Sequence, residues 1–290
     1  IATKLPHYMI KSIEGVEKTF QEELRRLQTD YIDYYLMHML TDTDTWEKLK
    51  HMGILDWIAA KMESGAIRNI GFSYHGHTEM FRQLVDAYDW DFCQIQFNYM
   101  DTQEQAGIKG YELAEKKNVP LIIMEPIKGG RLAAFSGDIA ERFQKLDESA
   151  SLASFALRWV GSFPNVKVIL SGMSSMEQVE DNLKTFSSFI PLSEEEIEVI
   201  QDVVRTMKGR IQNGCTGCKY CMPCPAGVDI PGCFGVWNQY HIYQNYNLVK
   251  QDWENSIGEK HQPKNCVKCG KCEEACPQKL SIRNDLEKVQ

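Results

Sequence analysis

The pattern of hydrophobic and polar positions is regular over the first two thirds of the chain. Short runs rich in β-branched and aromatic residues alternate with longer segments in which apolar residues recur every three or four positions. The first pattern is typical of buried strands and the second of amphipathic helices. Together they predict successive βα units around a parallel sheet. The expected strands are residues 1–4, 31–38, 69–74, 92–98, 120–126 and 166–172.

The helical segments between these strands define the expected architecture. Residues 15–28 form one amphipathic pattern, and residues 45–65 form another that ends on Gly65, where a glycine commonly follows a helix. Six strands and roughly six helices fall short of the eight of each that close a (β/α)8 TIM barrel. We therefore expect an α/β fold, a barrel lacking its first βα units in this chain, with roughly two such units of about 30 residues upstream. An open doubly wound sheet is the competing architecture.

Composition excludes several classes of protein. Hydrophobic residues make up 43% and charged residues 25% of the chain, as in ordinary globular proteins, and the net charge is -8. A nucleic-acid or membrane-surface role would need a positive field, so neither is expected. No apolar stretch is long enough to span a membrane, and the first ten residues do not have the pattern of a signal peptide. We expect a cytoplasmic protein.

Cysteines are concentrated at the end of the chain, where nine of the ten lie between Cys215 and Cys276 and Cys93 alone lies outside. They form two runs that each end in Cys-Pro. The second run has the spacing Cys-x₂-Cys-x₂-Cys-x₃-Cys of bacterial [4Fe–4S] proteins, and the first departs from it only by x₂ before its last cysteine. The runs comprise Cys215, Cys218, Cys221 and Cys224, then Cys266, Cys269, Cys272 and Cys276.

In such runs the cysteine before proline ligates the other cluster. Two [4Fe–4S] clusters are therefore expected, one on Cys215, Cys218, Cys221 and Cys276, the other on Cys266, Cys269, Cys272 and Cys224. Because the first run is one residue shorter before Cys224, Cys233 is an alternative to Cys224 as the fourth ligand. Paired Cys-x₂-Cys also builds zinc sites, but an unbroken ladder ending in proline, twice over, favours cubanes. Cys93, in an apolar strand, is expected to be a buried hydrophobe.

The βα pattern stops where glycines and then these cysteines begin, near residue 209. The segment between the two runs has a helical pattern. We therefore expect two domains, the N-terminally incomplete barrel over residues 1–208 and a small, mostly α-helical, ferredoxin-like domain over residues 209–290.

Two polar residues stand at the ends of expected strands. Lys4 closes the first and His38 the second. Because the carboxyl ends of parallel strands meet at one face of a barrel, both side chains should lie at the same mouth, which is where barrel enzymes carry their chemistry. Taken alone, each is more often a solvated lysine or a structural histidine.

Seven segments carry a family likeness: IATKLP, LQTDYIDYYLMH, IRNIGFSYHG, CQIQFNYMD, MEPIKGGRLA, SGMSSMEQVEDN and CTGCKYCMPCP. In these segments the chain resembles the aldo/keto reductase family, specifically its branch with a C-terminal ferredoxin-like domain. The resemblance covers nearly the whole chain. It implies that Lys4 is the lysine that lowers the pKa of a catalytic tyrosine, and that His38 is the histidine that orients or polarises the substrate carbonyl. The family's tyrosine and aspartate lie upstream of the first strand, so this chain as given is expected to reduce carbonyls slowly or not at all.

The same resemblance implies a nicotinamide cofactor, NADP(H) or NAD(H). Glycines that allow close approach, a lysine and a helix N-terminus suit its phosphates. Many relatives carry arginine where Gln178 stands, which leaves the choice of nucleotide open. Tyr74 replaces a frequent asparagine, and Tyr74 and Tyr99 are expected only to line the pocket. The implied contacts are Ser73 and Gln94 for the carboxamide, Lys128 and Gly130 for the pyrophosphate, and Gly172, Ser174, Gln178, Asp181 and Asn182 for the adenosine end.

These features predict an NAD(P)H-dependent oxidoreductase that transfers hydride between the nucleotide and a small carbonyl or alcohol substrate. An electron-transfer protein is the candidate partner of the clusters. Clusters carry single electrons and nicotinamides carry hydride, so direct exchange between them needs a mediator such as a flavin. The alternative is an electron-transfer or partner-binding module on a catalytically degenerate barrel. An aspartate and a tyrosine upstream of Lys4 would favour the enzyme.

Overall fold

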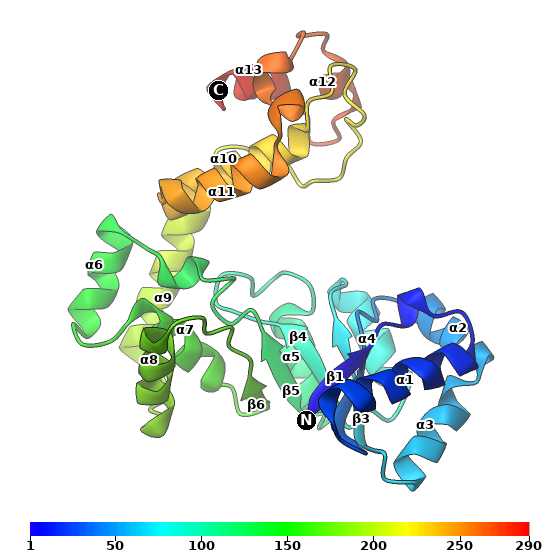
Figure 1. The fold of residues 1–290 in the computed structure, drawn as a ribbon. Helices are drawn as coiled ribbons and strands as arrows, with labels where there is room; N and C mark the ends of the chain where they lie inside the picture. The colour runs from blue at the N-terminus through cyan, green and yellow to red at the C-terminus, as the bar shows by residue number, and fades with distance from the viewer. Residues whose placement is uncertain (290) are drawn as a thin grey trace. The chain divides into compact units, whose positions relative to one another are not determined.

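The computed structural model describes residues 1–289, and its central element is a parallel sheet (Figure 1). Six strands pair in sequence order, each hydrogen-bonded to the next. This order is that of a (β/α)8 barrel and not the reversing order of a doubly wound sheet, so the structure is a partial barrel of the expected kind. The strands are β1 (Ala2–Leu5), β2 (Ile32–Met37), β3 (Ile67–Tyr74), β4 (Phe92–Gln96), β5 (Leu121–Met124) and β6 (Val166–Ile169).

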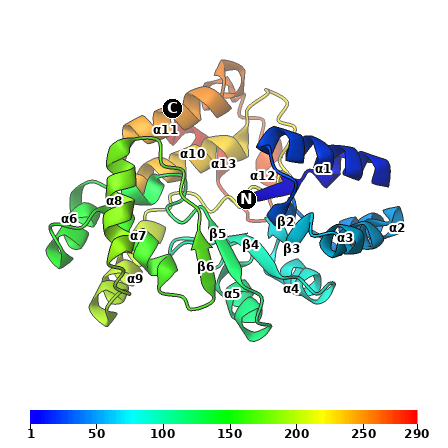
Figure 2. The ribbon, with the colours of Figure 1, turned by 60° about the horizontal axis from the view of Figure 1, so that its bottom comes forward.

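The chain divides into two compact units. The first contains residues 1–129 and 153–192, and the second contains residues 130–152 together with the chain from residue 193 onward. In the first unit the helices are η1 (His7–Met9), α1 (Ile13–Leu27), α2 (Thr43–Met52), α3 (Ile54–Glu63), α4 (Thr78–Asp86), α5 (Gly107–Lys116), α7 (Leu152–Gly161) and α8 (Met176–Ser187). Figure 2 shows α1–α5 along one side of the sheet.

The single helix expected over residues 45–65 is two helices, α2 and α3. Gly53 separates them with φ 98°, a left-handed conformation that only glycine adopts without strain. Its N–H caps α2 by donating to the carbonyls of Leu49 and Lys50. The end of the segment is as expected, because α3 stops at Glu63 and Gly65 follows with φ 74°.

Large aromatic side chains fill the space between the sheet and its outer helices. Trp90 lies 4.9 Å, between ring centroids, from both Trp46 and Phe72. The opposite face of the sheet has its own small cluster, formed by Leu36, Phe92 and Ile122. Both faces of the central strands are therefore apolar, as the interior of a barrel requires.

The second unit is helical, as expected for the C-terminal domain. Its helices are η2 (Arg131–Ala133), α6 (Gly137–Leu146), α9 (Glu194–Gly209), α10 (Ile230–Tyr243), α11 (Tyr246–Ser256), η3 (Glu259–His261), η4 (Pro263–Asn265), α12 (Lys271–Ala275) and α13 (Ile282–Lys288). Among residues 1–289, no helix has both the length and the apolar composition needed to cross a membrane.

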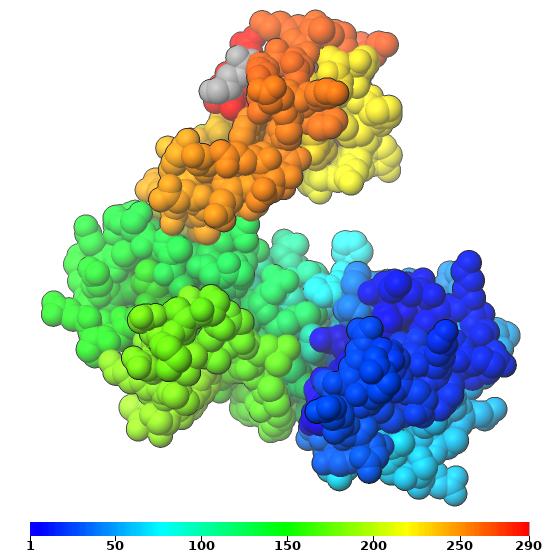
Figure 3. Space-filling model, viewed as in Figure 1, coloured from blue at the N-terminus to red at the C-terminus, as the bar shows by residue number. Residues whose placement is uncertain are grey.

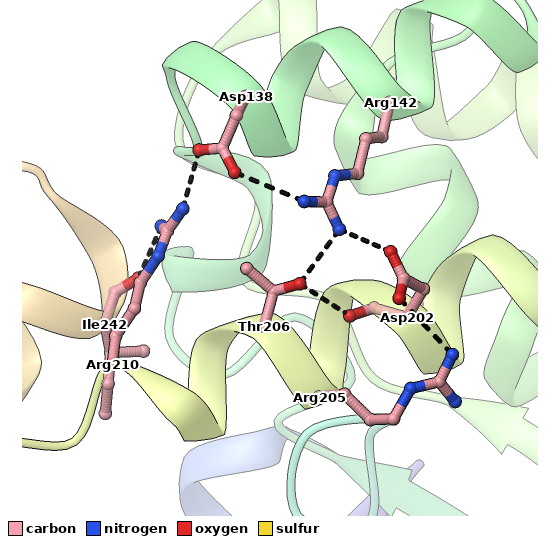
Figure 4. A network of polar contacts seen from close by, with 7 residues as sticks. All are labelled: Asp138, Arg142, Asp202, Arg205, Thr206, Arg210 and Ile242. Carbon is pink, nitrogen blue, oxygen red and sulfur yellow. Dashed lines mark hydrogen bonds and ion pairs between the residues drawn. The ribbon is translucent and has the colours of Figure 1, made fainter.

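Ion pairs join α6 to α9 and to the chain that follows it (Figure 4). Arg142 of α6 contacts Asp202 and donates to Thr206 Oγ1 at 2.9 Å. Arg210 donates to Asp138 at 2.6 Å and to the carbonyl of Ile242 in α10 at 3.4 Å. This is why residues 130–152 belong to the C-terminal unit although they lie within the sequence of the barrel.

A second set of contacts joins the same segment to α11. Arg131 donates to Asp252 at 2.6 Å, and Asn245 Nδ2 donates to the carbonyl of Ala134 at 3.2 Å. In Figure 3 the orange atoms of α11 meet green atoms at this place. Helices α10 and α11 are thus anchored at their junction, and α10 packs on α13 in the unit's apolar core.

Candidate functional site

Lys4 and His38 lie at the carboxyl ends of neighbouring strands. The register of β1 and β2 pairs Lys4 with Leu36, and His38 directly follows β2, with its N–H on the carbonyl of Leu5 at 3.1 Å. Burial lowers the pKa of His38, and the positive charge of Lys4 and then His75 lower it further. The imidazole is therefore neutral near pH 7 and within electrostatic reach of Lys4.

Two residues of η1 surround His38 and were not expected from the sequence. Tyr8 places its hydroxyl 3.4 Å from His38 Nδ1 and its ring 5.8 Å from the imidazole. His7 is buried, its Nε2 has no hydrogen-bond partner among the described residues, and burial lowers its pKa. The sequence signal was the HY pair three residues after Lys4, which a strand pattern alone does not interpret.

Ser73 and Gln94, the implied carboxamide contacts, are direct neighbours across β3 and β4. Both side chains are buried. Ser73 Oγ accepts from the N–H of Met39 at 2.9 Å, and Gln94 Nε2 is 3.2 Å from the sulfur of Met124. Sulfur is a weak acceptor, so the Gln94 amide retains most of its hydrogen-bonding capacity for another group.

Two tyrosines expected to line the pocket are instead in the core. Tyr74 is fully buried between Phe72 and Phe81, and its hydroxyl donates to the carbonyl of His77. Burial raises its pKa to about 12. Tyr99 is 3% exposed. Neither side chain presents a surface for a ligand.

Lys128 has a partner that the sequence did not suggest. Its Nζ lies 2.5 Å from Asp101 Oδ2, which also accepts from Gln96 Nε2 at 2.7 Å and from Asn98 Nδ2 at 3.1 Å. Asp101 is only 9% exposed at its side chain, so this is a buried polar cluster at the ends of β4 and β5. Lys128 must exchange this carboxylate for phosphate if it binds a nucleotide.

The two glycines after Lys128 both have a left-handed backbone. Gly129 and Gly130 have φ 62° and 89°. A Cβ built on Gly130 would meet nothing within 4 Å, so its backbone is open to approach. Glycine adopts this left-handed conformation without strain, because it has no Cβ.

The residues implied for the adenosine end come together at the start of α8. Ser174 donates its N–H to Gln178 Oε1 at 2.7 Å, and Asn182 Nδ2 donates to Ser171 Oγ at 2.9 Å. Ser175 caps the helix by accepting from the N–H of Gln178. Gly172 is exposed beside them, and Asp181 lies one turn further along α8. The remaining first-turn N–H groups of α8 suit an anion.

The eight cysteines of the two runs line two small cavities in the second unit. Cys221 borders both cavities. Three cysteines of each run meet the last cysteine of the other run. The first cavity is lined by Cys215, Cys218, Cys221 and Cys276, the second by Cys224, Cys266, Cys269 and Cys272.

Apolar residues and backbone turns hold these thiols. Ile230 lines both cavities, and Gly217 and Gly270 take φ 69° and 81° inside the two runs. Burial raises the pKa of Cys272 to about 11. A buried thiolate therefore needs a nearby cation, which iron supplies.

Cys233 is placed apart from both sets. It is buried in α10 against the apolar core, and its Sγ is 3.6 Å from the carbonyl of His261. It lines neither cavity, unlike Cys224. Cys93 is likewise buried, in β4, and burial raises its pKa.

The donor set of each cavity fits a [4Fe–4S] cluster, which takes four cysteine thiolates. Within residues 1–289, no three histidine, cysteine, aspartate or glutamate side chains are gathered closely enough to bind a single metal ion. A [4Fe–4S] cluster does not need its four ligands so close together, because each thiolate bonds to a different iron atom.

Comparison with known proteins agrees with this arrangement. The aldo/keto reductase family matches residues 1–205, and the 4Fe-4S dicluster domain matches residues 214–280. Among curated proteins, the uncharacterized oxidoreductase YrpG of Bacillus subtilis is 22% identical over 216 residues, covering 66% of this chain and 64% of YrpG. YqkF, an uncharacterized oxidoreductase of the same organism, is 22% identical over 207 residues, covering 64% of each protein. The chain thus spans about 64% of the length of these relatives.

Solved structures show the same fold. An aldo/keto reductase from Klebsiella pneumoniae, in complex with NADP and acetate, has a TM-score of 0.55 and 24% identity, with 70% of this chain and 69% of that chain covered. An aldo/keto reductase from Brucella melitensis has a TM-score of 0.53 and 20% identity, covering 69% and 72%. With the family match over residues 1–205, these likenesses establish that the chain belongs to the aldo/keto reductase family and continues into a 4Fe-4S dicluster domain.

Proposed function

We propose that this chain is part of an NAD(P)H-dependent oxidoreductase that reduces a small carbonyl compound or oxidises an alcohol, and that it carries two [4Fe–4S] clusters for exchange with an electron-transfer protein. The observation that carries the first part is the pair Lys4 and His38 at one strand-end face, with the imidazole held neutral. The observation that carries the second is the crossed set of cysteines around two cavities.

In the barrel, the nucleotide when bound supplies the hydride. The neutral imidazole of His38 donates a hydrogen bond to the substrate oxygen. If Tyr8 donates to His38 Nδ1, the proton of the neutral ring must be on Nε2, the nitrogen left to face the substrate. Lys4 contributes the positive charge that favours ionisation of an acid tyrosine supplied by the rest of the protein.

Nucleotide binding is tested by titrating NADPH and NADH against the chain and two lysine variants. Lys128→Ala should weaken NADPH binding about 10-fold, because a charge-assisted phosphate contact is lost. Lys117→Ala is the matched control, since Lys117 also pairs with an aspartate at 2.5 Å but at an exposed site. Equal affinities for the two variants would contradict the assignment of Lys128.

The clusters are tested by iron analysis after anaerobic purification, where roughly eight irons per chain are expected. Cys224→Ser should lower the iron content, whereas Cys233→Ser should leave it unchanged because Cys233 lines neither cavity. Zinc in place of iron, or loss of iron from Cys233→Ser alone, would contradict the proposed ligands.

A further inference from the structure

A third and larger cavity lies in the second unit and belongs to neither set of cysteines. Its volume is about 630 Å³, within the range of about 300–1,000 Å³ of small-molecule sites. Its walls come from α10, α11, the segment 262–264 and the end of α13. The segment 262–264 immediately precedes the second cysteine run, so a ligand in this cavity would lie near the start of that run.

The wall of this cavity is rich in aromatic rings. Trp237 and Tyr240 each meet the ring of His241 edge to face, at 5.7 and 5.3 Å between centroids. Rings on two neighbouring helices offer flat surfaces on which a planar conjugated ligand can stack. The five aromatic residues of the lining are Trp237, Tyr240, His241, Tyr246 and Trp253.

Three lysines and Glu254 also line the cavity, and two of the lysines form only long ion pairs. Lys250 pairs with Glu254 at 3.7 Å and Lys264 with Glu259 at 3.8 Å, whereas Lys288 pairs with Asp285 at 2.9 Å. All three lysine side chains are more than half exposed, so these pairs contribute little and can exchange for a phosphate. Lys264 belongs to η4 and Lys288 to α13, and these two helices pack together. The two lysines therefore form one end of the cavity, where an anion can bind.

The cavity wall continues directly into the second cysteine run. Pro263 lines the cavity, and its carbonyl accepts from the N–H of Cys266 at 2.9 Å. The carbonyl of Gln262, also in the lining, accepts from the N–H of Asn265 at 3.1 Å. A ligand in this cavity would therefore be separated from the Cys266 loop by a single backbone segment.

We propose that this cavity binds a flavin mononucleotide, with the isoalloxazine ring among the aromatic side chains and the phosphate at Lys264 and Lys288. This inference rests on the proposed function, because the two clusters are the electron acceptors of the flavin. A flavin takes a hydride from NAD(P)H and a proton from solvent, and it then gives two electrons, one to each of two oxidised clusters, with release of two protons.

The test is a fluorescence titration of FMN with the full chain purified anaerobically with its clusters. Stacking on the aromatic wall should quench flavin emission. Tyr246→Ala should weaken binding about 10-fold, as loss of a stacking ring does elsewhere. Tyr34→Ala is the matched control, because Tyr34 is also exposed, 45% against 66% for Tyr246, and belongs to the first unit.

The phosphate is tested separately with riboflavin, which has the ring without the phosphate. Lys288→Gln should weaken FMN binding several-fold and leave riboflavin unchanged, whereas Lys208→Gln, at an exposed lysine of α9, should affect neither. Absence of binding at millimolar FMN would overturn the proposal, and so would a loss seen with Tyr34→Ala rather than Tyr246→Ala. Iron content measured on the same samples separates the two proposals, since full iron without flavin binding refutes only the flavin site.

Discussion

Replacing Asp101 should destabilise the first unit far more than replacing an aspartate in a similar ion pair at the surface. Asp101 Oδ2 accepts from three donors, and the side chain is 9% exposed. In Asp101→Ala, the amides of Gln96 and Asn98 and the ammonium of Lys128 lose this acceptor together. Breaking a buried pair in this way costs about 3–5 kcal/mol.

Asp86→Ala provides the control. Asp86 pairs with Lys117 at 2.5 Å, the same separation as Asp101 and Lys128, but both side chains are nearly half exposed. An exposed pair contributes about 0–1 kcal/mol. The two aspartates thus differ in burial and in the number of donors, while the type of charge pair is held constant.

The assay is urea unfolding followed by tryptophan fluorescence, since Trp46, Trp57, Trp90 and Trp159 all belong to the first unit. In a thermal melt the Asp101→Ala loss corresponds to roughly 6–20 °C for a domain of this size. Equal shifts for Asp101→Ala and Asp86→Ala would refute the reasoning, because burial would then have no effect on the cost.

Three further changes have defined outcomes. Burial raises the pKa of Glu23 to about 7, so the folded state holds a proton that the unfolded state releases from pH 4.5 upward, and stability is lost as the pH rises to about 7. Glu23→Gln should therefore stabilise the protein at pH 8 and have little effect at pH 4, measured by urea unfolding. Gly71→Ala should cost about 1–3 kcal/mol, because its Cβ would lie 2.5 Å from the carbonyl oxygen of Phe92, whereas Gly209→Ala meets nothing and should be near neutral in thermal melts. Tyr8→Phe should raise the share of His38 protonated on Nδ1, seen in ¹⁵N NMR, and an unchanged tautomer ratio would remove Tyr8 from the site.

The parts of this fold that could be predicted from sequence are those determined locally. Strand positions follow from short apolar runs, and the cysteine sets follow from spacings within single loops. Gly53 shows the limit: a glycine within a helical pattern is compatible with one helix or two, and the packing of α2 and α3 on the barrel decides between them.

The cluster around Asp101 was missed for a different reason. Asp101 and Lys128 are 27 residues apart and meet only because β4 and β5 end side by side. Their positions after adjacent strands were visible in the sequence, but a lysine and glycines in one loop indicated phosphate binding without revealing a carboxylate partner. The membership of residues 130–152 in the second unit depends likewise on distant pairs such as Arg210 with Asp138.

The exchange of final cysteines between the two runs has a consequence for how the protein matures. Cys215 and Cys276 border one cavity although 60 residues separate them, so that cavity cannot acquire its fourth thiol until the intervening helices have formed. Iron uptake and the closure of this long loop would then be one cooperative event, as in small metal-dependent domains. A cell starved of iron would accumulate this segment as open chain, even where the barrel has already folded.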